Sequence, residues 1–425
     1  MYQGMLTGLA LALVWPSITL AEDWPSFRGP RGNGTSLDSH PPTQWSSEAN
    51  IKWKFKMPQS GNGSPIVSNG RVFVTSAQDV DGKQRSLYCL DRKNGKQLWV
   101  KTVEIKKKMP THQTNPYCGS TPAADGESVV VWHSSAGVFC YDFAGVERWS
   151  RNLGEFEHIW GYGSSPILLK DKVILHSGPG RRALITALDL RTGDTIWETE
   201  EPIENQGNSR NAAGQYEGSW CTPVLAKVEG ETQILCTMPT RLNAYDPESG
   251  SLIWFCEGIR GPKGDLAYSS PMVEGNRCVA IGGFGGPGIG VALGGRGNVT
   301  QKQRLWRLDK NPQSIGTGVF IGGRVYRANA ARPAPIECMD PATGKILWNS
   351  DPKGGICWGS IVVADGLGYV TNRKGTTIVF KIDPEKYVAI ASNDLGEPCH
   401  ATPAISDREI FIRTFERLYC ISESK

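Results

Sequence analysis

The 425-residue sequence lacks the short motifs by which many catalytic sites are recognised. It has no C-x-x-C or C-x-x-C-H pair, no H-E-x-x-H, no P-loop and no G-x-S-x-G, so it shows no local signature of those metal, haem, nucleotide or hydrolase sites. Its formal charge of +4 is spread along the chain, which argues against a nucleic-acid partner. Helical periodicity and apolar runs of about 18 residues are missing too, so no transmembrane helix is expected in the mature chain.

The first 21 residues resemble a secretory signal peptide. An apolar stretch from Leu6 to Trp15 is followed by Thr19 and Ala21, which place small residues before a cleavage point after Ala21. The resemblance departs from the usual pattern because no Lys or Arg precedes the apolar stretch, and a misassigned start codon would have the same effect. We expect an exported protein, periplasmic or extracellular, whose residues 22–50 form an extended segment.

Cysteine is abundant, with eleven residues, but its spacing does not suggest a disulfide framework. Cys89, Cys140, Cys338 and Cys420 occupy the same place in SLYCLD, VFCYD, IECMD and LYCIS. A residue type fixed at one place in a repeat is expected to be a small buried apolar residue. We therefore expect structural thiols, and the sequence leaves open whether one isolated disulfide forms.

What the chain has in quantity is turn residues and repetition, with 50 Gly, 27 Pro and 14 Trp. A Ser or Thr, usually followed by Pro, begins eight β-rich units at Ser64, Thr121, Ser165, Thr222, Ser270, Thr317, Ser360 and Thr402. Their spacing of about 48 residues is within reach of a four-stranded propeller blade. The sequence predicts an all-β protein in which residues 51–425 form one eight-bladed β-propeller with four-stranded antiparallel blades.

The last unit ends at LYCISESK and lacks a fourth strand. Residues 51–57, IKWKFKM, resemble the strand that closes the other units, as in KQLWVKTV. We expect this N-terminal strand to pair into the last blade, because closing the ring removes exposed strand edges.

A motif of the form D-x-x-(T/N/S)-G-x-x-x-W recurs within these units. It reads DRKNGKQLW, DLRTGDTIW, DPESGSLIW and DPATGKILW, with a shorter form, DFAGVERW. The carboxylate is expected to accept backbone N–H bonds across a turn, the Gly to adopt positive φ, and the Trp to pack against the next blade. The residues of this structural set are Asp91, Gly95, Trp99, Asp142, Trp149, Asp189, Gly193, Trp197, Asp246, Gly250, Trp254, Asp340, Gly344 and Trp348.

This repeated turn resembles the pyrroloquinoline-quinone (PQQ) repeat family. The family includes quinoprotein alcohol dehydrogenases and the propeller lipoprotein of the outer-membrane β-barrel assembly machine, and the chain is most similar to exported planctomycete members. The stretches that carry the likeness include DWPSFRGPRGNGTS, FEHIWGYGSSPIL, GGFGGPGIGVALGGRGNVT and LGEPCHATPAISDREIFIRTFERLYCI. The resemblance implies the fold strongly and the chemistry weakly.

The loops that lead into the innermost strands carry the candidate ligand residues, since propeller ligands usually lie at one mouth of the central channel. The candidates are Asn62, Asn115, Tyr117, His158, Trp160, Tyr162, Tyr216, Glu217, Trp220, Tyr268, Trp358 and His400. So many aromatic side chains at one rim predict a platform for a flat or sugar-like ligand. The alternative is that they only plug and pack the channel mouth.

The resemblance raises a second interpretation, a PQQ- and calcium-dependent dehydrogenase acting on an alcohol or sugar. Such an enzyme needs oxygen ligands for Ca²⁺, a catalytic Asp and usually a pair of adjacent cysteines, and this sequence has no Cys-Cys pair. Glu157, Asn115, Glu217 and Asp265 are near enough to the predicted rim to be considered, but none can be assigned. The cofactor is left open, and no metal ligand is predicted.

The run GGFGGPGIGVALGG is not read as a phosphate cradle, because no βαβ unit surrounds it. RLWRLD, at 304–309, is not followed by the D-x-x-T-G turn, so the run is expected to replace the turn of the fifth blade with a long hairpin insertion. This insertion is expected to contact a partner or to form a lid, and the alternative is that its excess Gly is only tolerated flexibility. The favoured function is a monomeric, non-catalytic binding or scaffold module whose ligand is a protein, a polysaccharide or a small molecule of the cell envelope.

Overall fold

The computed structural model describes residues 22–38, 40–180, 182–202, 214–331, 336–351 and 354–423. The predicted signal peptide, residues 1–21, lies outside them. Among the described residues, no helix has the length and apolarity needed to cross a membrane.

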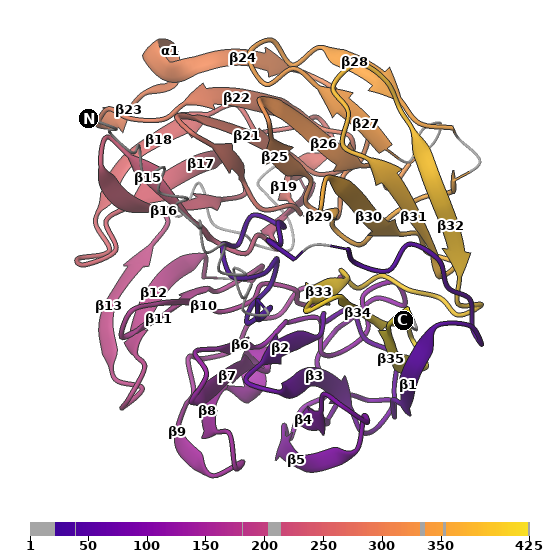
Figure 1. Ribbon diagram of the computed structural model, residues 1–425. Coiled ribbons are helices and arrows are strands. Elements are labelled where there is room, and N and C mark those ends of the chain that lie inside the picture. The colour runs from indigo at the N-terminus through magenta and orange to yellow at the C-terminus, as the bar shows by residue number, and fades with distance from the viewer. Residues whose placement is uncertain are drawn as a thin grey trace, which may run out of the picture.

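The described chain forms an all-β, eight-bladed propeller, as predicted (Figure 1). The first four blades, each from the channel outward, are β2–β5 (Ile66–Ser68, Arg71–Ala77, Gln84–Asp91, Gln97–Glu104), β6–β9 (Ala123–Ala124, Ser128–Trp132, Val138–Asp142, Glu147–Arg151), β10–β13 (Ile167–Leu169, Lys172–His176, Leu184–Asp189, Thr195–Glu200) and β15–β18 (Val224–Val228, Glu231–Thr237, Arg241–Tyr245, Leu252–Glu257). Blades five to seven are β20, β21, β22 and β24 (Met272–Glu274, Arg277–Ile281, Gly288–Ala292, Arg304–Leu308), β25–β28 (Val319–Ile321, Arg324–Ala328, Ile336–Met339, Ile346–Asn349) and β29–β32 (Val362–Ala364, Leu367–Thr371, Thr376–Lys381, Ala389–Asp394). Their apolar, β-branched inner strands are buried because each blade packs between two neighbours.

The eighth blade joins the two ends of the chain. It contains β33 (Ala404–Ser406), β34 (Glu409–Arg413), β35 (Arg417–Ile421) and, as its outer strand, β1 (Ile51–Lys56). β1 pairs antiparallel with β35, from Ile51 opposite Ile421 to Lys56 opposite Arg417. Figure 1 shows indigo β1 beside yellow β35. The prediction of ring closure by the N-terminal strand is confirmed.

The Trp of each repeated motif except Trp254 docks on the turn of the following blade. The indole N–H of Trp149 donates to the Leu190 carbonyl at 2.8 Å, and a Cβ placed on Gly193 of that turn would lie 2.6 Å from the Trp149 ring. Gly193 has a φ of +75°, so this turn needs glycine both for its backbone and for the close approach. The equivalent indole bonds are Trp53 to Arg92, Trp99 to Phe143, Trp197 to Pro247, Trp306 to Pro341 and Trp348 to Asp383.

A small residue lies directly opposite the Trp on the neighbouring strand. Cys89 pairs with Trp99, and the same arrangement recurs at Cys140 with Trp149, Ala187 with Trp197, Ala244 with Trp254, Gly290 with Trp306, Cys338 with Trp348 and Cys420 with Trp53. These cysteines are fully buried free thiols. They occupy a position where a larger side chain would collide with the indole ring.

The fifth blade corrects the expectation of a hairpin insertion. The second half of the Gly-rich run is the third strand of the blade, β22, and residues 304–308 are the outer strand β24, so RLWRLD is not a third strand. A Cβ on Gly290 would lie 2.2 Å from Trp306, which explains why a glycine-rich strand is needed here. Residues 293–303 replace the turn and contain β23 (Gly297–Asn298), which pairs parallel with β18, and α1 (Thr300–Gln303).

This connection covers the outer strand of the fourth blade instead of forming a lid over the channel. Val299 packs in the same apolar cluster as Trp254, and its N–H donates to the Phe255 carbonyl at 3.0 Å. Trp254 has no turn to dock on, and its indole donates to Gln233 Oε1 within its own blade at 2.9 Å. The connection therefore does the packing that the repeated turn does elsewhere.

Residues 22–38, the N-terminal strap, cross the channel on the face where the first and second strands of each blade join (Figure 1). Trp24 exchanges two backbone hydrogen bonds of 2.9 Å with Val67 in the first blade, and the Pro25 carbonyl accepts from Ala124 in the second. Further along, Ser36 donates to Val363 in the seventh blade. The strap therefore bridges opposite sides of the ring.

Candidate functional site

The first residue of every repeat contributes to a ring of hydroxyl groups around the channel. The backbone N–H of Ser64 donates to Thr121 Oγ1 at 3.0 Å, and corresponding bonds join Thr121 to Ser165, Ser165 to Thr222, Ser270 to Thr317, Thr317 to Ser360, Ser360 to Thr402, and Thr402 back to Ser64 at 2.9 Å. The remaining pair is joined by Ser270 Oγ, which donates to the Thr222 carbonyl at 2.7 Å. Seven hydroxyl oxygens thus accept from the backbone, which leaves their own protons for donation into the channel.

All eight hydroxyl residues line a cavity of about 480 Å³ on the channel axis. The residue two positions before each of them lines it as well: Asn62, Gly119, Gly163, Trp220, Tyr268, Ile315, Trp358 and His400. The first ring is chemically uniform and builds the channel. The second ring varies from blade to blade, so its side chains set the chemical character of the cavity.

Aromatic side chains form two groups on opposite sides of this cavity. Trp160 and Trp220, whose ring centroids lie 5.9 Å apart, precede the third and fourth blades, and Tyr268 lies 5.4 Å from Trp220. Trp358 and His400 precede the seventh and eighth blades, with ring centroids 4.6 Å apart. Because blades three and seven, and four and eight, are half a turn apart in a ring of eight, the two groups face each other across the cavity.

His400 is held in one neutral tautomer. Its Nδ1–H donates to the Thr114 carbonyl at 3.0 Å, and its Nε2 accepts from Arg373 Nε at 3.4 Å. Burial lowers the pKa of His400 to about 4, with smaller effects from the Thr114 carbonyl, which raises it, and the Arg373 charge, which lowers it. At neutral pH, His400 therefore presents an uncharged ring.

Two buried polar atoms of the cavity wall have no hydrogen-bond partner among the described residues. They are Asn62 Oδ1, an acceptor, and Trp358 Nε1, a donor. The Asn62 amide nitrogen is already used, because it donates to the Thr114 carbonyl and to Asn115 Oδ1 at 3.1 Å each. Both atoms have less than 1 Å² of accessible surface, so they lie within the wall and do not face the open cavity.

Of the twelve residues that the sequence suggested, seven line the cavity: Asn62, Asn115, Trp160, Trp220, Tyr268, Trp358 and His400. Five do not. Tyr117, His158 and Tyr162 lie around a separate cavity of about 30 Å³. Tyr216 contacts Trp160 with ring centroids 4.3 Å apart, and Glu217 is buried on β14 (Tyr216–Ser219). They support the wall from behind, because the loops that carry them turn away from the channel before the blade begins.

Sequence reasoning missed part of the wall. Ile315, Gly119 and Gly163 escaped notice because they are not polar or aromatic, although counting two residues back from each blade start would have found them. Phe27, from the N-terminal strap, and Phe284, from the Gly-rich run, also line the cavity. No sequence signal identifies these two, because they reach the channel only through the fold.

The cavity wall does not fit a calcium-bound quinone. Among its described lining residues there is no Asp, Glu, Lys or Arg, so it offers neither hard anionic ligands for Ca²⁺ nor a cation for the carboxylates of PQQ. Glu157 pairs with Lys107, and Asp265 pairs with Arg260 at 2.7 Å, both away from the cavity lining. The described chain also contains no cluster of three or more His, Cys, Asp or Glu residues placed to hold a metal ion.

The fold and its repeated turn define the protein as a PQQ-like β-propeller. It belongs to the family described as outer membrane protein assembly factor BamB, whose profile matches residues 43–155 and 83–350. No curated protein matches the sequence.

Solved structures share the fold at low sequence identity. BamB from Moraxella catarrhalis is 15% identical, with a TM-score of 0.58, over 89% of this chain and 99% of that one. Quinohemoprotein alcohol dehydrogenase from Comamonas testosteroni is 12% identical, with a TM-score of 0.65, over 95% and 81% of the two chains. A europium-containing methanol dehydrogenase is 11% identical, with a TM-score of 0.55, over 94% and 98%. BamB and two dehydrogenases are represented, so the fold alone does not select a function.

Proposed function

We propose that this protein is an exported, non-catalytic binding propeller that takes a neutral saccharide in its channel cavity. The observation that carries the proposal is the pairing of two aromatic groups across a cavity surrounded by hydroxyl donors. Sugar rings have apolar faces that stack on aromatic rings and polar edges that need hydrogen bonds, and this wall provides for both.

The electrostatics of the wall favour an uncharged ligand. No charged side chain belongs to the described lining, and His400 is neutral because its pKa is lowered. The eight blade-start Ser and Thr residues that line the cavity match a hydroxyl-bearing ligand, because a hydroxyl group can both donate and accept. A cavity of about 480 Å³ is in the range of small-molecule sites.

The experiment is a binding screen of the purified protein against neutral oligosaccharides, followed by calorimetric titration of the hits. Trp358→Ala is expected to weaken binding at least tenfold, and Trp358→Phe less, since phenylalanine keeps part of the stacking surface. Tyr387→Ala is the matched control, because Tyr387 contacts Trp348 at 5.8 Å in the blade body and does not line the cavity. Hits that bind Trp358→Ala as well as the wild type would contradict the proposal.

A second candidate function is binding of a cell-envelope protein, favoured by membership of the BamB family. Crosslinking in the periplasm tests it. A protein partner recovered with the wild type, and equally with Trp358→Ala, would place that function outside the cavity.

A further inference from the structure

The N-terminal strap closes the channel on the face where the first and second strands of each blade join. Phe27 lines the cavity, and Arg28, directly after it, is buried with its guanidinium donating to the Asn33 and Gly318 carbonyls. Gly318 belongs to the start of the sixth blade, while Trp24 and Pro25 are bonded to the first and second blades. The chain around Phe27 therefore spans the channel and ends the cavity at that side.

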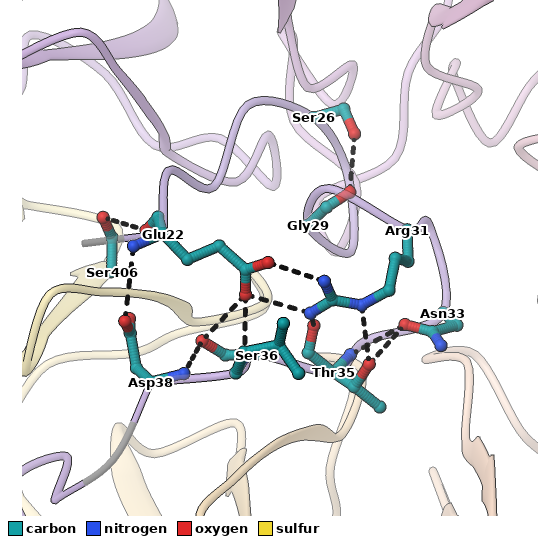
Figure 2. A network of polar contacts seen from close by, with 10 residues as sticks. Glu22, Ser26, Gly29, Arg31, Asn33, Thr35, Ser36, Asp38 and Ser406 are labelled. Atoms are coloured by element: carbon teal, nitrogen blue, oxygen red, sulfur yellow. Dashed lines mark hydrogen bonds and ion pairs between the residues drawn. The ribbon is translucent and has the colours of Figure 1, made fainter. Parts of the chain in front are cut away.

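The strap is fixed in this position by its own polar contacts (Figure 2). Glu22 and Arg31 form a two-pronged ion pair with distances of 2.6 and 2.9 Å, and the Leu37 N–H donates to Glu22 at 2.7 Å. Gly29 lies against Trp24, where a Cβ would be 2.8 Å from the indole ring. These contacts hold the two ends of the strap together, so the strap forms a fixed wall of the cavity.

The opposite side of the cavity reaches the surface. His112 is exposed and lines the cavity, and Trp160 and Trp358 are partly buried on the same face, where the loops enter the innermost strands. A ligand therefore enters and leaves by this face.

We infer that the cavity is a blind well that receives the terminal unit of a saccharide chain and not an internal segment. This inference rests on the proposed function. An internal segment must pass through a site or lie along a groove, whereas Phe27 closes this cavity and two aromatic groups surround it. The end of a chain can enter from the open face and stack between the aromatic groups, with the rest of the chain outside.

The test measures how binding capacity depends on chain length. The probes are amylose, xylan and β-1,3-glucan, each hydrolysed and separated into fractions of defined mean length, at equal mass. If the well binds chain ends, the amount of protein bound per unit mass of polysaccharide falls in inverse proportion to chain length. Cyclomaltohexaose, which has no chain end, then binds at least tenfold more weakly than linear maltohexaose. Capacity that is constant with length overturns the inference while leaving saccharide binding intact. Failure of every probe overturns the proposed function itself.

A variant at the bottom of the well adds a second readout. Phe27→Ala removes the ring that the terminal unit contacts, so affinity for ends should fall about three- to tenfold with the length dependence unchanged. Phe55→Ala is a control, because Phe55 contacts Tyr88 at 5.8 Å and lies outside the cavity lining. If Phe27→Ala binds short and long fractions as tightly as the wild type, Phe27 does not form the bottom of the site, and the inference is wrong.

Discussion

The indole N–H of Trp197 in the third blade donates to the carbonyl of Pro247 in the fourth blade at 3.1 Å. The same turn contributes Gly250, whose α-carbon faces the indole ring. One blade thus supplies the indole ring and the next blade supplies the turn on which it packs. Repetition of this contact around the propeller holds neighbouring blades together.

Truncation of Trp197 should destabilise the fold. Trp197→Ala is expected to lower the free energy of unfolding by about 3–5 kcal/mol, because it opens a cavity between two blades. Trp197→Phe keeps most of the packing but loses the hydrogen bond, so it should cost less. Urea unfolding of the three proteins gives the values. Equal losses for Ala and Phe would mean that the hydrogen bond, and not the buried ring, dominates.

Glycine at the turn is required for two separable reasons. Gly250 has a φ of +71° and Gly70 a φ of +72°, but a Cβ on Gly250 would lie 2.4 Å from Trp197 whereas a Cβ on Gly70 would meet nothing within 4 Å. Gly70→Ala should cost about 1 kcal/mol for the backbone conformation alone. Gly250→Ala should cost at least twice as much. If the two variants have the same melting temperature, the close approach to Trp197 does not contribute to the requirement for glycine.

Removal of β1 should destabilise the whole ring. Without Ile51–Lys56, β35 is left as an open edge, and the first-blade turn loses the Trp53 indole that donates to the Arg92 carbonyl at 2.8 Å. We expect a deletion of residues 51–57 to lower the melting temperature by more than 10 °C or to yield aggregated protein. Trp53→Ala removes the indole contact but keeps the strand, so it separates the two losses. Unchanged melting of the deletion would refute closure by this strand.

Buried histidines should make the fold sensitive to mild acid. Burial lowers the pKa of His133 to about 3 and that of His158 and His176 to about 4, against 6.5 in the unfolded chain. The unfolded state therefore binds more protons between these values, so stability present above pH 6.5 is lost as the pH falls toward 4. Urea midpoints measured from pH 7.5 to 4 should show this decline.

A variant at His133 is the control for that decline. Neither ring nitrogen of His133 has a hydrogen-bond partner among the described residues, so His133→Leu removes its titration without breaking a bond. The slope of stability against pH should decrease by about one proton. An unchanged slope would show that His133 does not contribute.

Addition of PQQ with Ca²⁺ should leave the protein without redox activity. The described cavity wall contains neither a carboxylate nor a cationic side chain for this pair. Titration of PQQ, followed by quinone absorbance, and dye reduction with alcohols and sugars provide the measurement. Saturable binding with turnover would favour the dehydrogenase interpretation over the binding propeller.

Much of the fold could be predicted because propeller blades repeat their physical requirements. Each blade needs a tight turn and a large apolar surface toward its neighbour, so Asp189, Gly193 and Trp197 recur in register in other blades. The fifth blade was misread for the same reason. Its third strand, Gly288–Ala292, consists largely of small residues, and a glycine-rich strand looks like a loop until Trp306 is seen to lie over Gly290.

The candidate site could be predicted only in part. Trp220 and His400 belong to the ring two residues before a blade start, so their position follows from the repeat. Tyr117 and Tyr162 lie in the same loops but turn away from the cavity. Alternation along a strand is regular, whereas the course of a long loop depends on what it packs against, and the sequence does not specify that locally.

By itself the sequence determined the number of blades, the turn between their outer strands and the closure of the ring, because these depend on contacts that every repeat makes with the next. Only the tertiary structure placed the N-terminal strap across the channel. Phe27 and Trp358 are more than 300 residues apart in the chain and line the same cavity, because the strap crosses the channel of the closed ring. Such a contact depends on the whole assembled ring and leaves no local pattern in the sequence.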